Sequence, residues 1–580
     1  MDGDRGRWAQ NWLPAYWLPA AGVTIGIALI AIPFLAIAIR SVLVWSGAYP
    51  HPSPWNFVAL VIDPRFGGAI LNTLIAAICT TAFSLVLGFC LAFLVSRTDM
   101  PARRLFGAVN VLPLFLSPYA GAVAWTFLLA PHDGLITTWA REAHGIVLPW
   151  LDIYSVAGVI FVLTLFHTPV VYWLTIAPLR AMDPALEDTA RVHGATFHYT
   201  LRHITMPLVL PALLSAALIV FITSAALIDV PLALGVSRGV RFVPTEIYAM
   251  ARGPSGPGPA GPGLTGLGEA AAFGVVVLAA SIALIVSRRR FLASSPLDGL
   301  NGGLIGGSYR RGRPHRIGWS GRVAALAFET IYLGCAVLLP LLALLIVSLT
   351  KFWTGRLAFG AMTQVNFRTV LSESEMTRGA IVNSLILAIA GATIGVALAV
   401  LQGYYLTRGD PPHRARLELS AVLPMGIPAV ILALGWLALT SRTPLYGTLA
   451  IILIAYLACY PAFVTRDVTA SFRRIDPELE QIARTSGAGW HQIMWHIVVP
   501  LVKPSLIASW LLLFVICFRE LGATILLYAQ GSETISVAMV ALSERDPGQA
   551  AALGVVQFVV LLLAGAIFWR NRAWRERRPA

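Results

Sequence analysis

Two polar stretches interrupt long apolar runs, and they carry the residue types that could do chemistry. The first, LEDTARVHGATFHYTLRHITMPLVLP, spans residues 186–211, and the second, LEQIARTSGAGWHQIMWHIVVPLVKP, spans residues 479–504. Each combines an acid, a glycine and spaced prolines. Acids cap the first N–H groups of helices and glycine ends helices, so this set suits a folded docking element better than bond-making catalysis.

The two stretches superpose without a gap. The alignment places Asp183 on Asp476, Pro184 on Pro477, Glu187 on Glu480, Ala190 on Ala483, Gly194 on Gly487, Ile204 on Ile497 and Pro207 on Pro500. Weaker echoes keep the same order along the chain, with NTL at Asn72 matching NSL at Asn383, and EAAAFGVV from Glu269 matching QAAALGVV from Gln549. The chain is therefore an internal repeat of two similar halves.

Each stretch predicts a helix, a glycine turn and a second helix. Asp183 and Pro184 suit the cap and first position of a helix that ends near His193, before Gly194. A second helix is expected to run to Pro207, with an apolar stripe on one face. One explanation is an amphipathic helix that lies on lipid. Exact duplication of acid, glycine and proline instead favours docking to two copies of a symmetric partner. The stripe consists of Phe197, Leu201 and Ile204, and of Trp490, Met494 and Ile497 in the second copy.

The elements that hold these stretches must cross a membrane. The 580 residues are 57% hydrophobic and 12% charged, with a mean hydropathy of +0.75, which excludes an ordinary soluble domain. Helices satisfy their own backbone hydrogen bonds in lipid, so we expect an all-α polytopic membrane protein. Twelve apolar runs of spanning length are predicted. They fall near 17–39, 70–95, 105–129, 153–178, 207–228, 268–287, 323–350, 380–405, 417–440, 446–465, 503–528 and 549–569.

The runs divide six and six, which predicts two homologous six-helix bundles arranged as a parallel repeat. The expected domains are 1–287 and 323–580, joined by a basic, Gly-rich cytoplasmic linker at 288–322. Placing the N-terminus inside puts most of the 42 Lys and Arg residues on the cytoplasmic side, so both termini are expected there. The net charge of +14 then indicates attraction to anionic lipid, with no nucleic-acid surface. A Gly/Pro-rich loop at 253–263 is expected to be a flexible insertion on the outside.

A few ionisable residues fall inside or near the predicted spans. Arg519 and Glu520 lie in the eleventh run, where they either line a translocation path or form an internal ion pair across a broken helix. Asp229 is a weaker candidate for that path, because it falls near the outer interface. Glu329 is expected to reach the cytoplasmic surface by snorkelling, and His167 to be a satisfied intramembrane polar residue. The five cysteines have no paired spacing, so no metal site is expected.

No signature of catalysis accompanies these features. A P-loop needs Gly-Lys-Ser/Thr, and the chain has lysine at 351 and 503 alone, in neither case after glycine. The chain is therefore not expected to be an enzyme, and no catalytic residue or cofactor is assigned to it.

The repeated loop resembles a known element. Glu-x-x-Ala-x-x-x-Gly followed by Ile-x-x-Pro is similar to the cytoplasmic loop of permease subunits in binding-protein-dependent ABC importers, and the likeness covers nearly the whole chain. That resemblance implies a multi-pass protein of the bacterial cytoplasmic membrane. It also implies two partners, a separate ATPase dimer that binds ATP and Mg, and an extracytoplasmic substrate-binding protein. Its ATPase-coupling residues would be Glu187, Ala190, Gly194, Ile204, Pro207, Glu480, Ala483, Gly487, Ile497 and Pro500.

The fused double permease and two segments after the loops narrow the resemblance. ALIDVPLALG (226–235) and FRELGATILLY (518–528) are similar to segments of ferric-iron-type permeases. Permeases for thiamine, phosphonate and polyamine share related segments, so these substrates stay open. A secondary transporter is the alternative from another class, but it would not need two identically spaced cytoplasmic docking loops.

Overall fold

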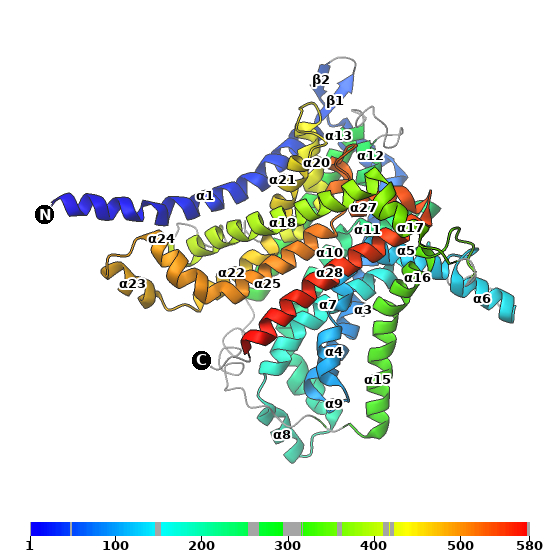
Figure 1. Cartoon of the computed structure of the whole chain (residues 1–580), viewed down its shortest axis with the longest axis horizontal. Coiled ribbons are helices and arrows are strands. Elements are labelled where there is room, and N and C mark those ends of the chain that lie inside the picture. Colours follow the sequence, from blue (N-terminus) through cyan, green and yellow to red (C-terminus); the bar gives the residue numbers. More distant parts are fainter. Residues whose placement is uncertain are drawn as a thin grey trace.

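The computed structural model describes residues 2–46, 49–145, 152–252, 266–293, 315, 317–356, 362–409, 417 and 423–576. Within these residues the protein is almost entirely helical (Figure 1). One antiparallel hairpin of strands β1 (Leu43–Ser46) and β2 (Tyr49–Pro52) is the only sheet there. The expected all-α fold is confirmed.

The first half begins with the long helix α1 and ends with α13. Its helices are α1 (Asp2–Ser41), α2 (Trp55–Ile62), α3 (Pro64–Arg97), α4 (Arg103–Val109), η1 (Leu112–Phe115), α5 (Pro118–Leu129), α6 (Leu135–His144), α7 (Val156–Ala181), α8 (Pro184–Val192), α9 (Phe197–Thr200), η3 (Leu201–Thr205), α10 (Met206–Ala226), α11 (Asp229–Leu234), η4 (Val236–Arg238), α12 (Val243–Arg252) and α13 (Gly266–Ala293).

The second half repeats this order with small differences. Its helices are α15 (Trp319–Leu333), η5 (Gly334–Leu338), α16 (Leu339–Ser348), α17 (Val365–Arg368), η7 (Thr369–Glu373), α18 (Glu375–Tyr404), η8 (Tyr405–Gly409), η9 (Leu423–Gly426), α20 (Ala429–Thr440), α21 (Leu449–Cys459), α22 (Ala462–Arg473), α23 (Pro477–Thr485), α24 (Trp490–Ile493), η10 (Met494–Val498), α25 (Val499–Phe518), α26 (Thr524–Leu527), α27 (Ile535–Ser543) and α28 (Pro547–Glu576).

Most of the predicted spans are single long helices. Among the described residues, nine helices are long and apolar enough to cross a membrane, and two bent pairs raise the number to 11 if each pair is one span. The bent pairs are the runs near 105–129 and 446–465, with bends of 93° and 51°. The run near 417–440 contains the shorter helix α20, and part of it lies outside the described residues. The loop at 253–263 and most of the linker also lie outside them.

The first span of each half packs on the other half. Helix α1 contacts α18, α20 and α21, and α16 contacts α5 as well as α28. The Gln402 side-chain amide donates to the Gly22 carbonyl at 3.3 Å, and the Tyr332 hydroxyl donates to the Leu165 carbonyl at 3.3 Å. The two predicted bundles therefore exchange their first helices, and the halves are not independent packing units.

This exchange corrects the expectation for Glu329. Its side chain does not snorkel to the surface, because it has no exposed area and lies close to the buried Asn110 of the other half. Neither Glu329 carboxyl oxygen has a hydrogen-bond partner among the described residues. The sequence position alone suggested a helix end in contact with water, whereas the exchanged packing covers that end.

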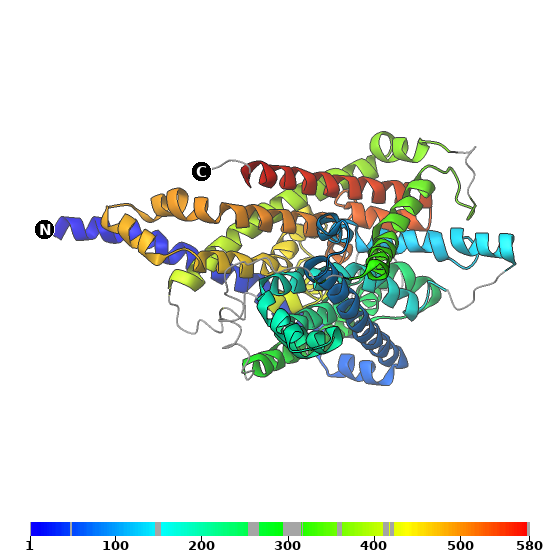
Figure 2. The ribbon, with the colours of Figure 1, turned by 90° about the horizontal axis from the view of Figure 1, so that it is seen from below.

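Two helical arms carry the repeated loops. Helices α3, α7 and α10 pack together in one arm, and α18, α22 and α25 in the other. In Figure 1, α8 lies at the lower end of the first arm and α23 at the left end of the second, while the β1–β2 hairpin lies at the top. Figure 2 again places α23 and the N-terminus at one end of the molecule and α6 at the other. Each loop thus lies at the end of one of the two helical arms.

Candidate functional site

The backbone of each loop follows the predicted helix and glycine turn. The Asp183 carboxylate accepts a hydrogen bond from the Ala185 N–H at 2.9 Å, and Asp476 does the same for Glu478 at 3.0 Å. Gly194 and Gly487 have φ of +80° and +86°, in the left-handed region that favours glycine. The helices that they end, α8 and α23, begin at the predicted proline.

The second helix of each loop does not stop at proline, which corrects that expectation. The segment Phe197–Ala226 is one continuous helical span of 30 residues, and Trp490–Phe518 is its counterpart. Each passes through a π-helical turn, η3 or η10, just before Pro207 or Pro500. Proline cannot donate to the carbonyl one turn earlier, and a wider π turn absorbs that missing bond without breaking the helix.

Glu187 is buried under its own loop and does not point at solvent. Its Oε1 accepts a hydrogen bond from the Thr205 hydroxyl at 2.8 Å. Its Oε2 lies 3.9 Å from an Arg97 guanidinium nitrogen, at the end of α3. The same guanidinium donates to the Met182 carbonyl at 3.0 Å, just before the loop begins. Glu187 therefore ties α8 to the end of α3 and to the turn η3 of the following span.

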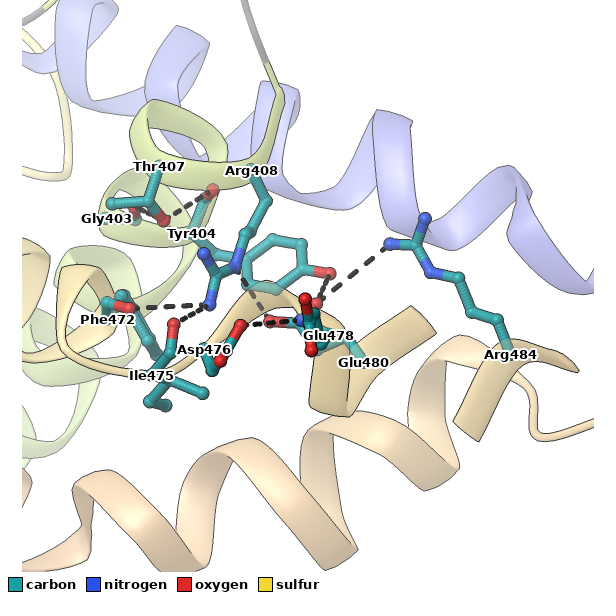
Figure 3. A network of polar contacts seen from close by, with 10 residues as sticks. All are labelled: Gly403, Tyr404, Thr407, Arg408, Phe472, Ile475, Asp476, Glu478, Glu480 and Arg484. Carbon is teal, nitrogen blue, oxygen red and sulfur yellow. Dashed lines mark hydrogen bonds and ion pairs between the residues drawn. The ribbon is translucent and has the colours of Figure 1, made fainter. Parts of the chain in front are cut away.

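Glu480 is held in the same way and more tightly (Figure 3). Arg408 Nε donates to Glu480 Oε1 at 2.8 Å, and the Tyr404 hydroxyl donates to Oε2 at 3.1 Å. Arg484 lies 4.0 Å from the same carboxylate. Arg408 also donates to the Ile475 carbonyl at 2.9 Å, so it fixes the chain before α23. Both acids are paired and hydrogen-bonded, as burial of a charge requires.

Arg97 and Arg408 are functional candidates that the sequence analysis missed. Arg97 ends α3 within SRTD, and Arg408 lies in η8, which follows α18, within TRGD; their separation equals that between Asn72 and Asn383. If one half had also been aligned on the other by the separation of Asn72 and Asn383, Arg97 would have fallen on Arg408. Only the fold shows that they meet the loop glutamates, because the partners lie in different spans.

Each loop exposes an apolar side chain within a largely polar surface. Val192 on α8 is 85% exposed, and Ile482 on α23 is 61% exposed. Of the other predicted coupling residues, some are half-buried and some exposed. Ala190, Ala483, Ile204 and Ile497 are half-buried, and Gly194, Gly487, Pro207 and Pro500 are exposed. The pattern shared by the two halves thus divides into buried anchoring residues and exposed residues.

The linker end reaches the first loop. The His315 N–H donates to the Arg97 carbonyl at 2.8 Å, and the Asp99 N–H donates to the His315 carbonyl at 3.1 Å. The Asp99 carboxylate accepts hydrogen bonds from the Ile317 N–H at 2.9 Å and from Arg322. The Arg322 hydrogen bond, followed by that of Ile317, lowers the pKa of Asp99. The start of α15 is thereby fixed to the end of α3.

Arg519 and Glu520 lie together at a break between α25 and α26, but they do not pair with each other. Among the ion pairs of the described residues, none joins them. Arg519 donates to the carbonyls of Leu114, at 2.7 Å, and of Leu116, in the bend before α5. The internal ion pair considered from the sequence is therefore replaced by a contact between the two halves.

Glu520 caps the short helix α26. Its carboxylate accepts hydrogen bonds from the Ala523 and Thr524 N–H groups, from the Thr524 hydroxyl at 2.6 Å, and from the Tyr460 hydroxyl at 2.9 Å. A carboxylate at a helix N-terminus is favourably placed. Glu520 thus satisfies the backbone groups that the break exposes inside the membrane region.

Asp229 begins α11, at the equivalent break in the first half, and is 5% exposed. A β-carbon at Gly522 would lie 3.6 Å from Ile228, so the two breaks adjoin. The same β-carbon would lie 3.5 Å from Glu520 Oε1, so Glu520 also borders this junction. The three predicted path residues therefore gather where broken helices of both halves meet. His167, as expected, is satisfied by the Leu163 carbonyl at 2.8 Å.

Comparison with known proteins identifies the family of this chain. The family described as "Binding-protein-dependent transport system inner membrane component" matches twice, over residues 84–292 and 395–571. The chain belongs to this family. It is a fused, multi-pass inner-membrane permease of the ABC importer type with two copies of the family domain, and it is not an enzyme.

The relatives of this permease differ in how much of it they match. The Fe(3+)-transport system permease protein FbpB 2 of Haemophilus influenzae is 22% identical over 91% of this chain and 92% of its own length. The ferric transport system permease protein FbpB of Actinobacillus pleuropneumoniae is 23% identical over 82% of this chain and 67% of its own. PhnV of Salmonella typhi, named as a 2-aminoethylphosphonate transport system permease, is 30% identical over 42% of this chain and 94% of its own.

Proposed function

We propose that the permease takes up ferric iron by alternating access, driven by a separate ATPase dimer that grips the two loops. The buried glutamate–arginine anchor, present once in each half, is the observation that carries this proposal. A loop that transmits force must be rigidly joined to the spans that move. Glu187 and Glu480 make that joint, and Val192 and Ile482 are exposed apolar side chains that a docking partner could cover.

Movement of the loops would pass along the two arms. A partner that pulls on α8 acts through Glu187 and Arg97 on α3, and through the π turn η3 on α10. A partner that pulls on α23 acts through Glu480 and Arg408 on α18. Because the first spans are exchanged between halves, each arm also moves against a helix from the other half. Closure of a symmetric ATPase dimer on ATP would therefore change the spacing of the arms.

The translocation path is proposed to run between the adjoining breaks near Arg519, Glu520 and Asp229. Broken helices near the middle of a membrane protein commonly line substrate sites, because irregular backbone is tolerated there only in a cavity or within protein. A substrate-loaded binding protein would dock on the opposite face from α8 and α23. The loops would thus lie on the cytoplasmic side, with both termini.

Ferric iron is favoured by the extent of the match. The match with FbpB 2 covers 91% of this chain and 92% of FbpB 2, so it extends over both halves. PhnV is more similar per residue but matches about one half, so phosphonate is the second candidate. Thiamine and polyamine stay further candidates from the sequence resemblance.

Uptake measurements in cells separate the two substrates. Cells that express this permease with its cognate ATPase and binding protein are expected to accumulate radioactive ferric iron and not 2-aminoethylphosphonate. Replacing Gly194 and Gly487 together by proline should abolish that uptake without preventing membrane insertion. Uptake of the phosphonate alone would overturn the iron proposal, and normal uptake by the double variant would overturn the coupling role of the loops.

A further inference from the structure

Glu329 is a fully buried acid at the contact between the two halves. It lies on α15, in the first span of the second half, and has no exposed area. Neither of its carboxyl oxygens makes a hydrogen bond, and no ion pair of the described residues includes it. An isolated carboxylate in a protein interior is very costly, and such a group takes up a proton instead. The surroundings of Glu329 therefore favour its neutral form.

Asn110 offers the matching partner from the first half. It directly follows α4, has no exposed area and lies close to Glu329. Its side-chain nitrogen and its side-chain oxygen are both without a hydrogen bond among the described residues. Two neighbouring side chains thus contribute four buried polar atoms that lack a partner, whereas buried polar groups are almost always satisfied. The two side chains are the natural partners of each other.

The balance of donors and acceptors decides which charge state fits. A carboxylate only accepts, so an ionised Glu329 would leave the side-chain oxygen of Asn110 without a donor. A protonated carboxyl has one donor and retains acceptor capacity, and a carboxamide likewise has both. With a proton on Glu329, the two groups can satisfy each other through two hydrogen bonds.

Two tyrosines near Glu329 use their hydroxyl protons elsewhere. The Tyr172 hydroxyl on α7 donates to the Gly107 carbonyl at 3.1 Å, and the Tyr332 hydroxyl on α15 donates to the Leu165 carbonyl at 3.3 Å. Unperturbed phenols are neutral near pH 7. Neither tyrosine therefore supplies Glu329 with a donor or a counter-charge.

The arginines of this region do not supply a counter-charge either. Arg180 on α7 lies beside Gly107, where an added β-carbon would be 3.8 Å from its guanidinium, but it forms no ion pair with Glu329. Arg322, earlier on α15, is paired with Asp99. The charge of an ionised Glu329 would thus stay uncompensated.

The position of Asn110 gives this contact a mechanical role. Asn110 lies in the bent pair Arg103–Phe115 and Pro118–Leu129, just before the bend of 93°. At the bend itself, Arg519 of the second half donates to the Leu114 and Leu116 carbonyls. The second half therefore contacts this broken span of the first half at two points, through Glu329 and through Arg519.

We propose that Glu329 and Asn110 form a proton-binding site between the two halves, in which the neutral acid and the amide hydrogen-bond to each other. The bound proton holds α15 against the end of α4. Loss of the proton at alkaline pH removes the donor and leaves a buried charge, so the contact weakens as pH rises. The attachment of the bent span to the second half therefore depends on the proton concentration.

Infrared difference spectroscopy on the full chain, purified in detergent without any partner, tests the charge state. At neutral pH the native chain is expected to show the carbonyl stretch of a protonated carboxyl group that Glu329→Gln lacks. Glu375→Gln, which removes an exposed acid at the start of α18, is the matched control and should keep that absorption. Identical carboxyl absorption in the native chain and in Glu329→Gln would overturn the proposal, since Glu329 would then be ionised.

Thermal unfolding of the same preparations gives an independent measurement. Glu329→Gln keeps a donor and an acceptor, so it should unfold close to the native temperature at neutral pH and lose less stability than the native chain as pH rises. Asn110→Leu should lower the unfolding temperature by several degrees, because it leaves the acid without a partner. Adding Glu329→Leu should recover part of that loss, since apolar groups then replace both partners.

Two results of these unfolding measurements would contradict the proton-binding site. One is a large loss of stability in Glu329→Gln at neutral pH, which would mean that the contact needs a carboxylate. The other is a double variant that loses the sum of the two single losses, which would mean that the side chains do not interact. Because no ATPase, binding protein or substrate is present, these results are independent of the proposed transport function.

Discussion

At the scale of single residues, the permease uses one buried carboxylate per loop as a joint. Glu480 has partners on both oxygens, from Arg408 and Tyr404. Glu187 has one short hydrogen bond and a longer ion pair. Removing one member of a buried ion pair leaves the other charge unpaired. The free-energy cost of that unpaired charge exceeds the net stabilisation that the pair gives. The two loops should therefore respond unequally to the same substitution.

Glu480→Gln should destabilise the protein by about 3 kcal/mol, because it leaves Arg408 buried without its counter-charge. Glu187→Gln should cost less, about 1 kcal/mol, because the amide oxygen can still accept from Thr205 and the ion pair with Arg97 that is lost is longer, at 3.9 Å. Thermal unfolding of the purified variants checks this order. Asp188→Asn, on the exposed side of α8, is the control and should have little effect. A larger loss for Glu187→Gln than for Glu480→Gln would contradict the account.

Gly487→Ala should destabilise the turn after α23 by about 1 kcal/mol, since the residue has φ of +86°. No atom lies within 4 Å of the added β-carbon, so the cost is conformational and not steric. Gly489→Ala is the matched control, with φ of −74° and its nearest neighbour 4.0 Å away. The rate of proteolytic cleavage in the loop compares the two variants, and Gly487→Ala should be cleaved faster. Equal cleavage of the two variants would show that the left-handed turn is unimportant.

At the scale of elements, the exchanged first helices hold the two halves together. Gly435 on α20 lies against the backbone of α1, where an added β-carbon would be 2.4 Å from the Pro33 carbonyl oxygen. Such close contacts allow helices to approach in membranes. The same packing buries Glu329 against the first half.

Gly435→Ala should therefore displace α1 and lower stability by about 1–3 kcal/mol, as overpacking does. Gly379→Ala on α18, where nothing lies within 4 Å, should be close to neutral. Thermal unfolding, together with protease access to the N-terminal helix, compares the two. If Gly435→Ala left both unchanged, the close packing of α1 on α20 would be refuted.

The link between α3 and α15 should depend on pH. Arg322 and the Ile317 N–H hold the pKa of Asp99 below its usual range. A depressed carboxyl pKa contributes stability above the unfolded value, near 4, and that contribution is lost as pH falls through the lower folded value. The link is thus fully present at neutral pH.

Asp99→Asn should mimic strong acid at pH 7 and speed tryptic cleavage after Arg322. Asp63→Asn, which removes an acid paired with Arg65 elsewhere, should not, and equal cleavage would exclude this role for Asp99.

At the scale of the whole molecule, sequence patterns predicted the class of fold and the loops, and missed the contacts between distant segments. Apolar length identified the long spans because lipid imposes it. Cap and glycine chemistry is local, so α8 and α23 were placed to within a residue. Three features depend on tertiary packing instead. They are the continuation of the helix past Pro207 after a π turn, the burial of Glu329 and the hydrogen-bond partners of Arg519. None of these leaves a mark in the periodicity of a single chain.

Site-specific crosslinking in native membranes tests the central claim most directly. A photo-reactive side chain at Val192 or at Ile482, both well exposed on the loops, should capture the same ATPase subunit. The same probe at Val61 on α2, which is 86% exposed, should not capture it. Capture from both loop positions would support a model in which each loop binds one subunit of an ATPase dimer. Capture from neither loop, or labelling of both loops from the outer face of the membrane, would contradict the account.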